Sequence, residues 1–289
     1  MSAKVASGRG HRSFPRFTDR LLLNGALQVS PFCLGFVRDP STVSHAFDQG
    51  INFFFVTADM HWPVYDGLRR GLAELFARGK SVRDEVVVAV VAYVTQPEFC
   101  HAPFREVIEA IPGLGHVDVT VAGGSYEGDF AARAPQFAQH GPLGARAFGT
   151  SFHDRRLAAR ALKEGLVDIG FVRYNSDHRG AEEDVFRHVG PRSAERRALL
   201  YNFTTTFGFV PPGRYAELGL GSGHWKPSIT EHYRFVLDRP EIDGVLCAPQ
   251  TPEEVDSLAS ALARGPLSDE EIAYLRDLSD LSQGRASLT

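Results

Sequence analysis

The sequence predicts an α/β protein folded as a (β/α)8 TIM barrel, with a β-hairpin before the barrel and an extra helix after it. Apolar runs of strand length recur along the chain, and amphipathic segments of helix length follow most of them. Several runs are apolar almost throughout, as expected for parallel strands that are buried on both faces. A chain of 289 residues is also a common length for one barrel.

The N-terminal hairpin is predicted at residues 19–30, because Asn24-Gly25 stands between two apolar runs and this pair favours a tight turn. The eight barrel strands are then expected within 30–36, 51–58, 85–94, 117–124, 145–151, 167–175, 198–206 and 244–250.

Helices are predicted at 65–79, 104–111, 154–165 and 251–265, with the extra C-terminal helix at 267–280. Asp154 and Thr251 are expected N-caps, and Thr251 has Glu254 three residues later. Gly165 and Gly265 stand where helices usually end in a left-handed residue. These helix-capping residues support the alternation of strands with helices.

Residues 17–289 are expected to form a single barrel domain, and residues 1–16 a flexible N-terminal arm. The arm is basic but has no apolar core, so it does not resemble a secretory signal; an organelle transit peptide is the alternative. The three cysteines are widely spaced and predict neither a disulfide framework nor a zinc site, which fits a cytoplasmic protein.

The expected partner is a small-molecule ligand or substrate. A net charge of -4 gives no reason to expect nucleic acid, and the longest apolar run, residues 86–94, is too short to cross a membrane. The sequence carries no pattern that predicts an oligomeric state.

In a barrel of this kind, function lies in the loops at the carboxyl ends of the strands. Many aromatic residues fall in these loops, which predicts a roomy apolar pocket. Residues 206–228 form a long loop that is expected to be a lid or a pocket wall. The predicted substrate pocket contains Trp62, Tyr93, Tyr126, Tyr174 and Trp225.

The chain resembles the aldo-keto reductases over nearly its whole length. The resemblance rests on "GINFFFVTAD", "AFGTSFH", "VDIGFVRYN", the segment 231–262 and the closing "LSDEEIAYL", which all occur in family order. It implies the barrel fold and, for ordinary members, reduction of carbonyl compounds with a nicotinamide cofactor.

The same resemblance implies that the catalytic residues of the family are missing. Family members use an Asp, Tyr, Lys and His tetrad, in which the Tyr gives a proton to the carbonyl oxygen. Here Val56 stands at the Asp position and His61 at the Tyr position, Val91 is the best match to the Lys, and Gly123 falls at the His. We therefore expect this chain to have lost the reductase chemistry.

The cofactor contacts implied by the family are also reduced. Ser151 is in place, Asn175 belongs to a family-like Tyr-Asn pair, and Phe203 matches the aromatic residue that stacks on nicotinamide. Phe152 and Phe171, however, replace an Asn and a Gln that hold the carboxamide. Residues 247–258 contain acids and no basic residue, which is a poor site for a phosphate. No cofactor is favoured, and binding of NADPH is a weakened possibility.

The predicted catalytic residues are His61, Asp59 and His153, all at or just beyond strand ends. His61 replaces the family acid directly and could handle a proton, because the ordinary pKa of histidine is about 6.5. Asp59 has an alternative structural role in capping the next turn. No metal site is expected, because no His-x-His or His-x-x-x-His pair is present.

Three functions remain open at the level of sequence. The favoured one is a repurposed biosynthetic enzyme that binds an apolar or aromatic small molecule and catalyses a non-redox acid/base step, such as cyclisation, dehydration or isomerisation. The first alternative is a pseudoenzyme that binds a ligand or partner without turnover. The second is an NADPH-dependent oxidoreductase with an atypical acid.

Overall fold

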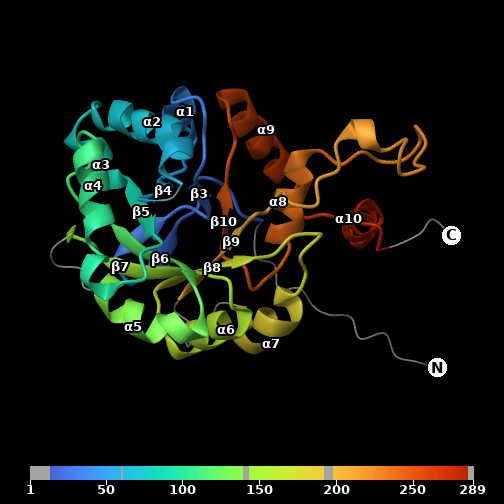
Figure 1. Cartoon of the computed structure of the whole chain (residues 1–289). Coiled ribbons are helices and arrows are strands. Elements are labelled where there is room, and N and C mark those ends of the chain that lie inside the picture. Colours follow the sequence, from blue (N-terminus) through green and yellow to red (C-terminus); the bar gives the residue numbers. More distant parts are fainter. Residues whose placement is uncertain (1–13, 60, 139–142, 192–197, 286–289) are drawn as a thin grey trace.

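The computed structural model describes residues 14–59, 61–138, 143–191 and 198–285 (Figure 1). Within them, parallel strands form a closed eight-stranded barrel in the order β10-β3-β4-β5-β6-β7-β8-β9. This confirms the predicted fold class. The strands are β3 (Phe32–Leu34), β4 (Phe53–Thr57), β5 (Val87–Ala92), β6 (Val119–Ser125), β7 (Ala147–Phe152), β8 (Ile169–Arg173), β9 (Leu199–Phe203) and β10 (Gly244–Cys247).

The predicted hairpin is also confirmed, and it closes the N-terminal end of the barrel. Strands β1 (Leu21–Leu23) and β2 (Leu27–Val29) pair antiparallel. Asn24 and Gly25 take positive φ angles of 49° and 69° in the turn, which these two residue types accept at low cost. The buried side chains of the hairpin pack against inward residues of β4 and β5. The hairpin therefore covers the barrel interior at this end.

Helices surround the barrel (Figure 1). They are α1 (Ser41–Asp48), α2 (Asp66–Phe76), α3 (Lys80–Glu85), α4 (Ala102–Ala110), α5 (Glu127–Phe137), α6 (Arg155–Glu164), α7 (Arg187–Val189), α8 (Ile229–Leu237), α9 (Pro252–Ala263) and α10 (Asp269–Ser282). Short 3-10 turns lie at η1 (Trp62–Tyr65), η2 (Pro97–Phe99) and η5 (Pro212–Arg214), and a π-helical turn at η4 (Glu182–Phe186).

The predicted helix boundaries are largely correct. The carboxylate of Asp154 accepts hydrogen bonds from the first turn of α6, and the hydroxyl of Thr251 accepts one from the Glu254 N–H. Gly165 and Gly265 both have positive φ, as helix ends require. The flexible arm predicted at residues 1–16 lies mostly outside the described residues. In the described residues, no helix is long and apolar enough to cross a membrane.

The loop over residues 206–228 does not have its predicted position as a lid. It extends past α8 toward α10 and away from the centre of the barrel (Figure 1). Val210, Tyr215 and Leu220 form a small separate core with Leu278 of α10. The length and aromatic content of the loop are explained by this contact, because a long segment needs apolar surface of its own to stay folded.

Four buried or half-buried polar side chains fix the strands at the N-terminal end of the barrel. Each stands directly before an even-numbered strand and accepts a backbone N–H from the preceding strand segment. The pairs are Asn52 with Ser30 N (2.8 Å), Asp118 with Val88 N (2.9 Å), Asp168 with Phe148 N (2.8 Å) and Asp243 with Leu200 N (2.9 Å). We call these four residues the register anchors.

Removal of a register anchor should measurably lower the free energy of unfolding. Asn52 also donates from Nδ2 to the carbonyls of Gln28 (2.8 Å) and Glu85 (3.1 Å), so Asn52→Ala removes three hydrogen bonds and leaves the buried Ser30 N–H unpaired. We expect the free energy of unfolding to fall by about 2–4 kcal/mol in urea denaturation. Gln28→Ala, which removes an exposed amide from the same hairpin, should change it by less than about 0.5 kcal/mol. Equal effects of the two substitutions would contradict the assignment.

Candidate functional site

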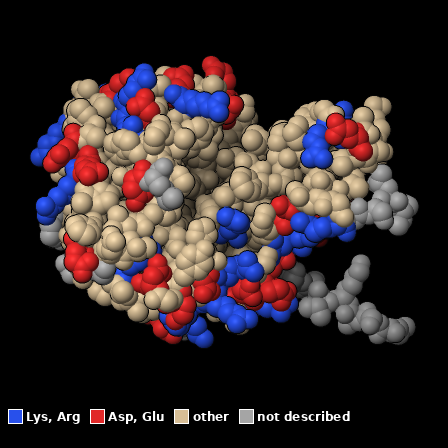
Figure 2. All heavy atoms as spheres, in the orientation of Figure 1, with Lys and Arg blue, Asp and Glu red and all other residues tan. Residues whose placement is uncertain are grey.

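The open end of the barrel is hollowed in the middle of the ring of helices, and most of the surface around the hollow is neutral (Figure 2). Strand geometry decides which side chains reach it, because successive side chains point alternately inward and outward. On β4, Phe53 and Phe55 belong to the interior cluster, whereas Phe54 and Val56 pack against the helices. Thr57 therefore follows on the inward face.

Val56, the position assigned to the family's Asp, thus faces the helix layer. A side chain there cannot reach the open end, whatever its chemistry. The inward residue at this strand end is Thr57, whose Oγ1 is buried and has no hydrogen-bond partner in the described part of the chain. Letter spacing in "FVTAD" does not report the pleat of the strand, so the position assigned to the Asp falls on the outward face.

The aromatic ring of Tyr93 fills the space above Gly123. A Cβ added at Gly123 would lie 2.7 Å from two atoms of that ring, so any side chain at this position would have to displace Tyr93. Gly124 follows with a φ of +63°, and a Cβ there would lie 3.3 Å from the His153 ring. These two glycines let the Tyr93 and His153 side chains approach each other across β6.

His153 lies beside two aromatic rings at the open end. Its imidazole stacks on Tyr126 with a centroid distance of 5.6 Å, and it meets Phe203 edge-on at 6.5 Å. Burial, together with the positive charge of Arg173, lowers the pKa of His153 below its ordinary value of 6.5. At neutral pH the imidazole is therefore mainly unprotonated and can accept a proton.

Arg173 is a residue of the open end that the sequence reading missed. It is the last residue of β8, two positions after the inward Phe171, and it pairs in register with Phe203 of β9. Its guanidinium lies 5.8 Å from the Phe203 ring centroid. The signal was present in the sequence: a lone basic residue occupies the inward face of an otherwise apolar strand.

Ser151 and Phe203 also lie on inward positions, as the resemblance requires for a ligand-facing role. The Ser151 Oγ accepts a hydrogen bond from the Gly124 N–H at 2.9 Å, and its own proton can still be donated to a ligand. Phe203 packs on the interior cluster and is half-buried. Phe152 instead faces outward against Phe130, and Phe171 is buried below the opening.

The segment after β4 brings Asp59 and His61 near Tyr93. The Asp59 carboxylate accepts a hydrogen bond from the Tyr93 N–H, so it holds the end of β5 in place. The exposed His61 ring meets Tyr93 edge-on at 5.4 Å. Trp62 turns toward α2, where the Arg69 guanidinium lies 3.6 Å from its ring centroid. It lines a cleft with Ala58 and Asp59 on one side and Glu106, Glu109 and Ala110 of α4 on the other.

Tyr174 and Asn175 do not have their predicted roles, because both are fully buried. Tyr174 is on the outward face after β8, stacks on Phe235 at 5.7 Å and donates to Glu182 at 2.7 Å. The Asn175 amide donates to Thr204 O (2.8 Å) and accepts from the N–H groups of Asp177 (3.0 Å) and His178 (2.8 Å). Its polar atoms shape the loop and are not presented to a cofactor.

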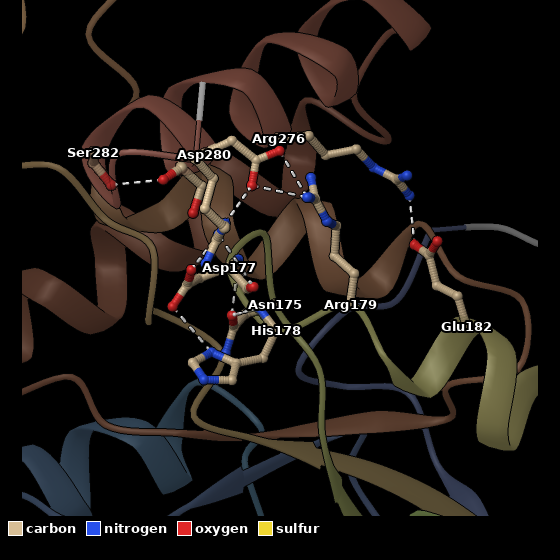
Figure 3. Close-up of polar contacts among 10 residues, drawn as sticks. Asn175, Asp177, His178, Arg179, Glu182, Arg276, Asp280 and Ser282 are labelled. Atoms are coloured by element: carbon tan, nitrogen blue, oxygen red, sulfur yellow. Dashed lines mark hydrogen bonds and ion pairs between the residues drawn. The ribbon is translucent and has the colours of Figure 1, made fainter. Parts of the chain in front are cut away.

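The loop after β8 is joined to the C-terminal helix by ion pairs (Figure 3). Arg179 contacts Asp280 at 2.7 Å, and Arg285 pairs with both Asp177 and Asp280. Trp225 is placed by the same helix: its ring lies 5.5 Å from that of Tyr274, and its carbonyl accepts the Tyr274 hydroxyl at 2.8 Å. The predicted pocket role of Trp225 is therefore replaced by docking of the long loop.

The N-terminus of α9 is occupied by side chains of its own segment. The Glu254 carboxylate accepts the Gln250 N–H at 2.7 Å. A hydrogen bond with Thr251 lowers the pKa of Glu253, which keeps that carboxyl ionised. A phosphate would meet negative charge here and not free N–H groups. Among the described residues, no three His, Cys, Asp or Glu side chains are grouped to hold a metal ion.

Solved structures of aldo-keto reductases are similar to this chain. The holo form of AKR11C1 from Bacillus halodurans has a TM-score of 0.68 at 14% identity, covering 94% of this chain and 98% of its own. AKR2E5 of the silkworm Bombyx mori has a TM-score of 0.65 at 14% identity, covering 90% and 87%. Silkworm AKR2E4, solved in complex with NADP, has a TM-score of 0.64 at 16% identity, covering 90% and 92%.

At these identities the similarity concerns the fold. No protein-family model matches the sequence, and no curated protein matches it. The expected resemblance is thus confirmed at the level of architecture: the chain has the barrel fold of the aldo-keto reductases, including the N-terminal hairpin.

The packing of Tyr93 on Gly123 can be tested by adding one methyl group. Gly123→Ala should displace the ring and lower the free energy of unfolding by about 1–3 kcal/mol, because the new Cβ clashes with it. Gly128→Ala is the matched control: it lies in the first turn of α5 with open space around it and should stabilise by about 0.4–1 kcal/mol. Urea unfolding measures both, and a neutral Gly123→Ala would rule out the contact.

The pKa of His153 can be followed by NMR titration of its ring protons. We expect a value below 6.5, so the imidazole stays neutral as the pH falls through the range in which an ordinary histidine becomes charged. Arg173→Met should raise this pKa without restoring the ordinary value, because burial is the larger cause and remains. The exposed Arg105→Met is the control and should leave the titration unchanged; equal shifts would refute the coupling.

Proposed function

We propose that this protein is a non-redox acid/base enzyme of the aldo-keto reductase superfamily, acting on a small aromatic or apolar molecule at the open end of the barrel. The proposal rests chiefly on one observation: His153, with its lowered pKa, stands between the Tyr126 and Phe203 rings. A neutral imidazole beside aromatic surfaces is a base placed where an aromatic ligand can stack.

The family's nicotinamide cofactor does not fit the residues at this end. Ser151 alone remains of the carboxamide contacts, because Phe152 faces the helices and Phe171 is buried beneath the opening. Glu253 and Glu254 stand at the start of α9, where a phosphate would need positive charge. The inward residues Thr57, Val91 and Gly123 supply none of the family's Asp, Lys and His, and His61 stands where the resemblance places the Tyr. We therefore derive no hydride transfer for this protein.

The chemistry that the residues support is proton transfer at a carbon next to a carbonyl group. His153 would take the proton, and the electron pair of the broken C–H bond would move to the carbonyl oxygen. Return of the proton to another carbon gives an isomerisation. Loss of a hydroxyl from the neighbouring carbon, protonated as it leaves, gives a dehydration. Ser151 offers a hydroxyl donor to the developing negative charge.

His61 is a second proton-handling group in this proposal, on the Tyr93 side of the opening. Asp59 is a positioning residue, because its carboxylate holds the Tyr93 backbone. A cytoplasmic location and a single barrel domain over residues 17–289 belong to the same proposal. They are consistent with the three free buried cysteines and with the described residues, in which hairpin, barrel and C-terminal helix are joined by packing and ion pairs.

The proposal can be tested by measuring the exchange of a substrate C–H proton for deuterium, with phenylpyruvate as the substrate. Phenylpyruvate in D2O should incorporate deuterium at C3 faster with the protein than with buffer alone. His153→Gln should reduce the catalysed rate by at least about 100-fold, because a positioned general base contributes about that much or more. The exposed His224→Gln is the control and should keep the full rate.

The same samples separate the alternatives. A ligand-binding pseudoenzyme would bind the probe and give no exchange above buffer. An atypical reductase would bind NADPH, seen as a change in its fluorescence, and consume it with phenylpyruvate. Exchange that survives in His153→Gln but is lost in His61→Gln would move the base to His61 and overturn the assignment of His153.

A further inference from the structure

Arg173 is exceptional among the partly buried arginines of the molecule. Arg83, Arg133 and Arg234 are buried, and each guanidinium donates to carbonyl oxygens and pairs with a carboxylate. The half-buried arginines other than Arg173 also have oxygen partners; they are Arg69, Arg179, Arg239 and Arg276. The positive charge of each of these arginines is therefore balanced by oxygen partners within the protein.

Arg173 lacks such compensation in the described part of the chain. No hydrogen bond or ion pair joins its side chain to a described residue, and its Nε is buried without a partner. A guanidinium held partly out of water and unpaired costs free energy. Packing alone does not explain an unpaired arginine at this position, because a neutral side chain of similar length would fill the same space without the desolvation cost. The missing partner is expected to be an anion from outside the chain.

The residues around Arg173 indicate what kind of anion would bind there. Phe203 lies under the guanidinium, and His153 is close enough for the two charges to repel. The Asp59 carboxylate, on the Tyr93 side of the opening, accepts the Tyr93 N–H. The hydroxyl of Ser151 is a further donor on an inward position. An incoming group would thus meet donors and aromatic faces.

A single guanidinium favours a carboxylate over a phosphate. Its two parallel N–H bonds match the two oxygens of a carboxylate. A phosphate dianion is usually held by several cations or by a helix N-terminus, and the N-terminus of α9 is blocked by Glu254. The rings of Phe203, Tyr126 and Tyr93 suit an aromatic body attached to the carboxylate.

We infer that the open end of the barrel binds an aromatic monocarboxylate, with the carboxylate on Arg173 and the ring against Phe203 and Tyr126. This names the substrate class of the site in the proposed function and rests on that proposal for its link to catalysis. The binding itself requires only the unpaired guanidinium and the aromatic walls.

Isothermal titration with 3-phenylpropionate tests the inference without any reaction, because this probe has no ketone to activate. The native protein should bind it at least about 10-fold more tightly than 3-phenylpropionamide, which has the same shape without the charge. Arg173→Met should weaken binding of the acid by about 10- to 100-fold and leave the amide unchanged. Arg173→Lys should give an intermediate loss, because lysine keeps the charge without the planar fork.

Stability provides a second, independent measurement. Arg173→Met should raise the Tm by about 2 °C or more in the absence of ligand, because it removes an unpaired, partly buried charge. Arg105→Met, on the exposed face of α4, is the matched control for both measurements and should change neither. A fall in Tm on Arg173→Met would mean that the guanidinium has a structural partner, and this result would overturn the inference.

Further outcomes of these binding and exchange experiments would refute the binding inference or separate it from the proposed catalysis. Equal affinity for acid and amide, unchanged acid binding in Arg173→Met, or tighter binding of phenyl phosphate than of 3-phenylpropionate would each refute the aromatic monocarboxylate. If 3-phenylpropionate binds through Arg173 but phenylpyruvate shows no catalysed exchange, the binding inference stands and the proposed catalysis fails. If phenylpyruvate is exchanged equally by the native and Arg173→Met proteins, the catalysis stands and the carboxylate anchor fails.

Discussion

The hydrogen bonds of the register anchors set the geometry on which the rest of the barrel depends. Asn52, Asp118, Asp168 and Asp243 each accept an N–H from the neighbouring strand segment, so alternate strands are fixed in pairs at the closed end. A slip of one residue would exchange every inward and outward side chain of a strand. The strand register is fixed at the closed end of the barrel. The residues that point inward at the open end are therefore every second residue along each strand.

That counting explains the composition of the site. Phe171, two residues below Arg173 on β8, closes the floor with apolar surface, and the next inward position places a cation at the rim. On β6 the inward position is Gly123, and the Tyr93 ring takes the vacant space. Within the described residues, the result is an aromatic opening with a guanidinium that has no oxygen partner and an imidazole of lowered pKa, an arrangement suited to orienting an anion next to a base.

Much of the architecture could be predicted from the sequence, because turns, caps and apolar runs are local signals. Asn24-Gly25, Asp154 and Gly165 each act through their own backbone neighbourhood. The facing of side chains at strand ends is not local, which is why Val56 and Tyr174 were assigned to the opening although both face the helices. Trp225 was misplaced for another reason: its partner, Tyr274, lies 49 residues away in the chain. Even the register anchors have a sequence signal, since an apolar β-branched residue precedes each of them.

The separation of the two ends of the barrel explains how this fold can tolerate a costly residue at its site. The register anchors and the hairpin stabilise the closed end, whereas Arg173, His153 and Ser151 lie at the open end. The cost of an unpaired guanidinium is local, and burial of the interior apolar cluster offsets it. A barrel built in this way can exchange its chemistry residue by residue without losing its strands. Similarity of architecture to reductases at 14–16% identity is therefore compatible with a different reaction at the opening.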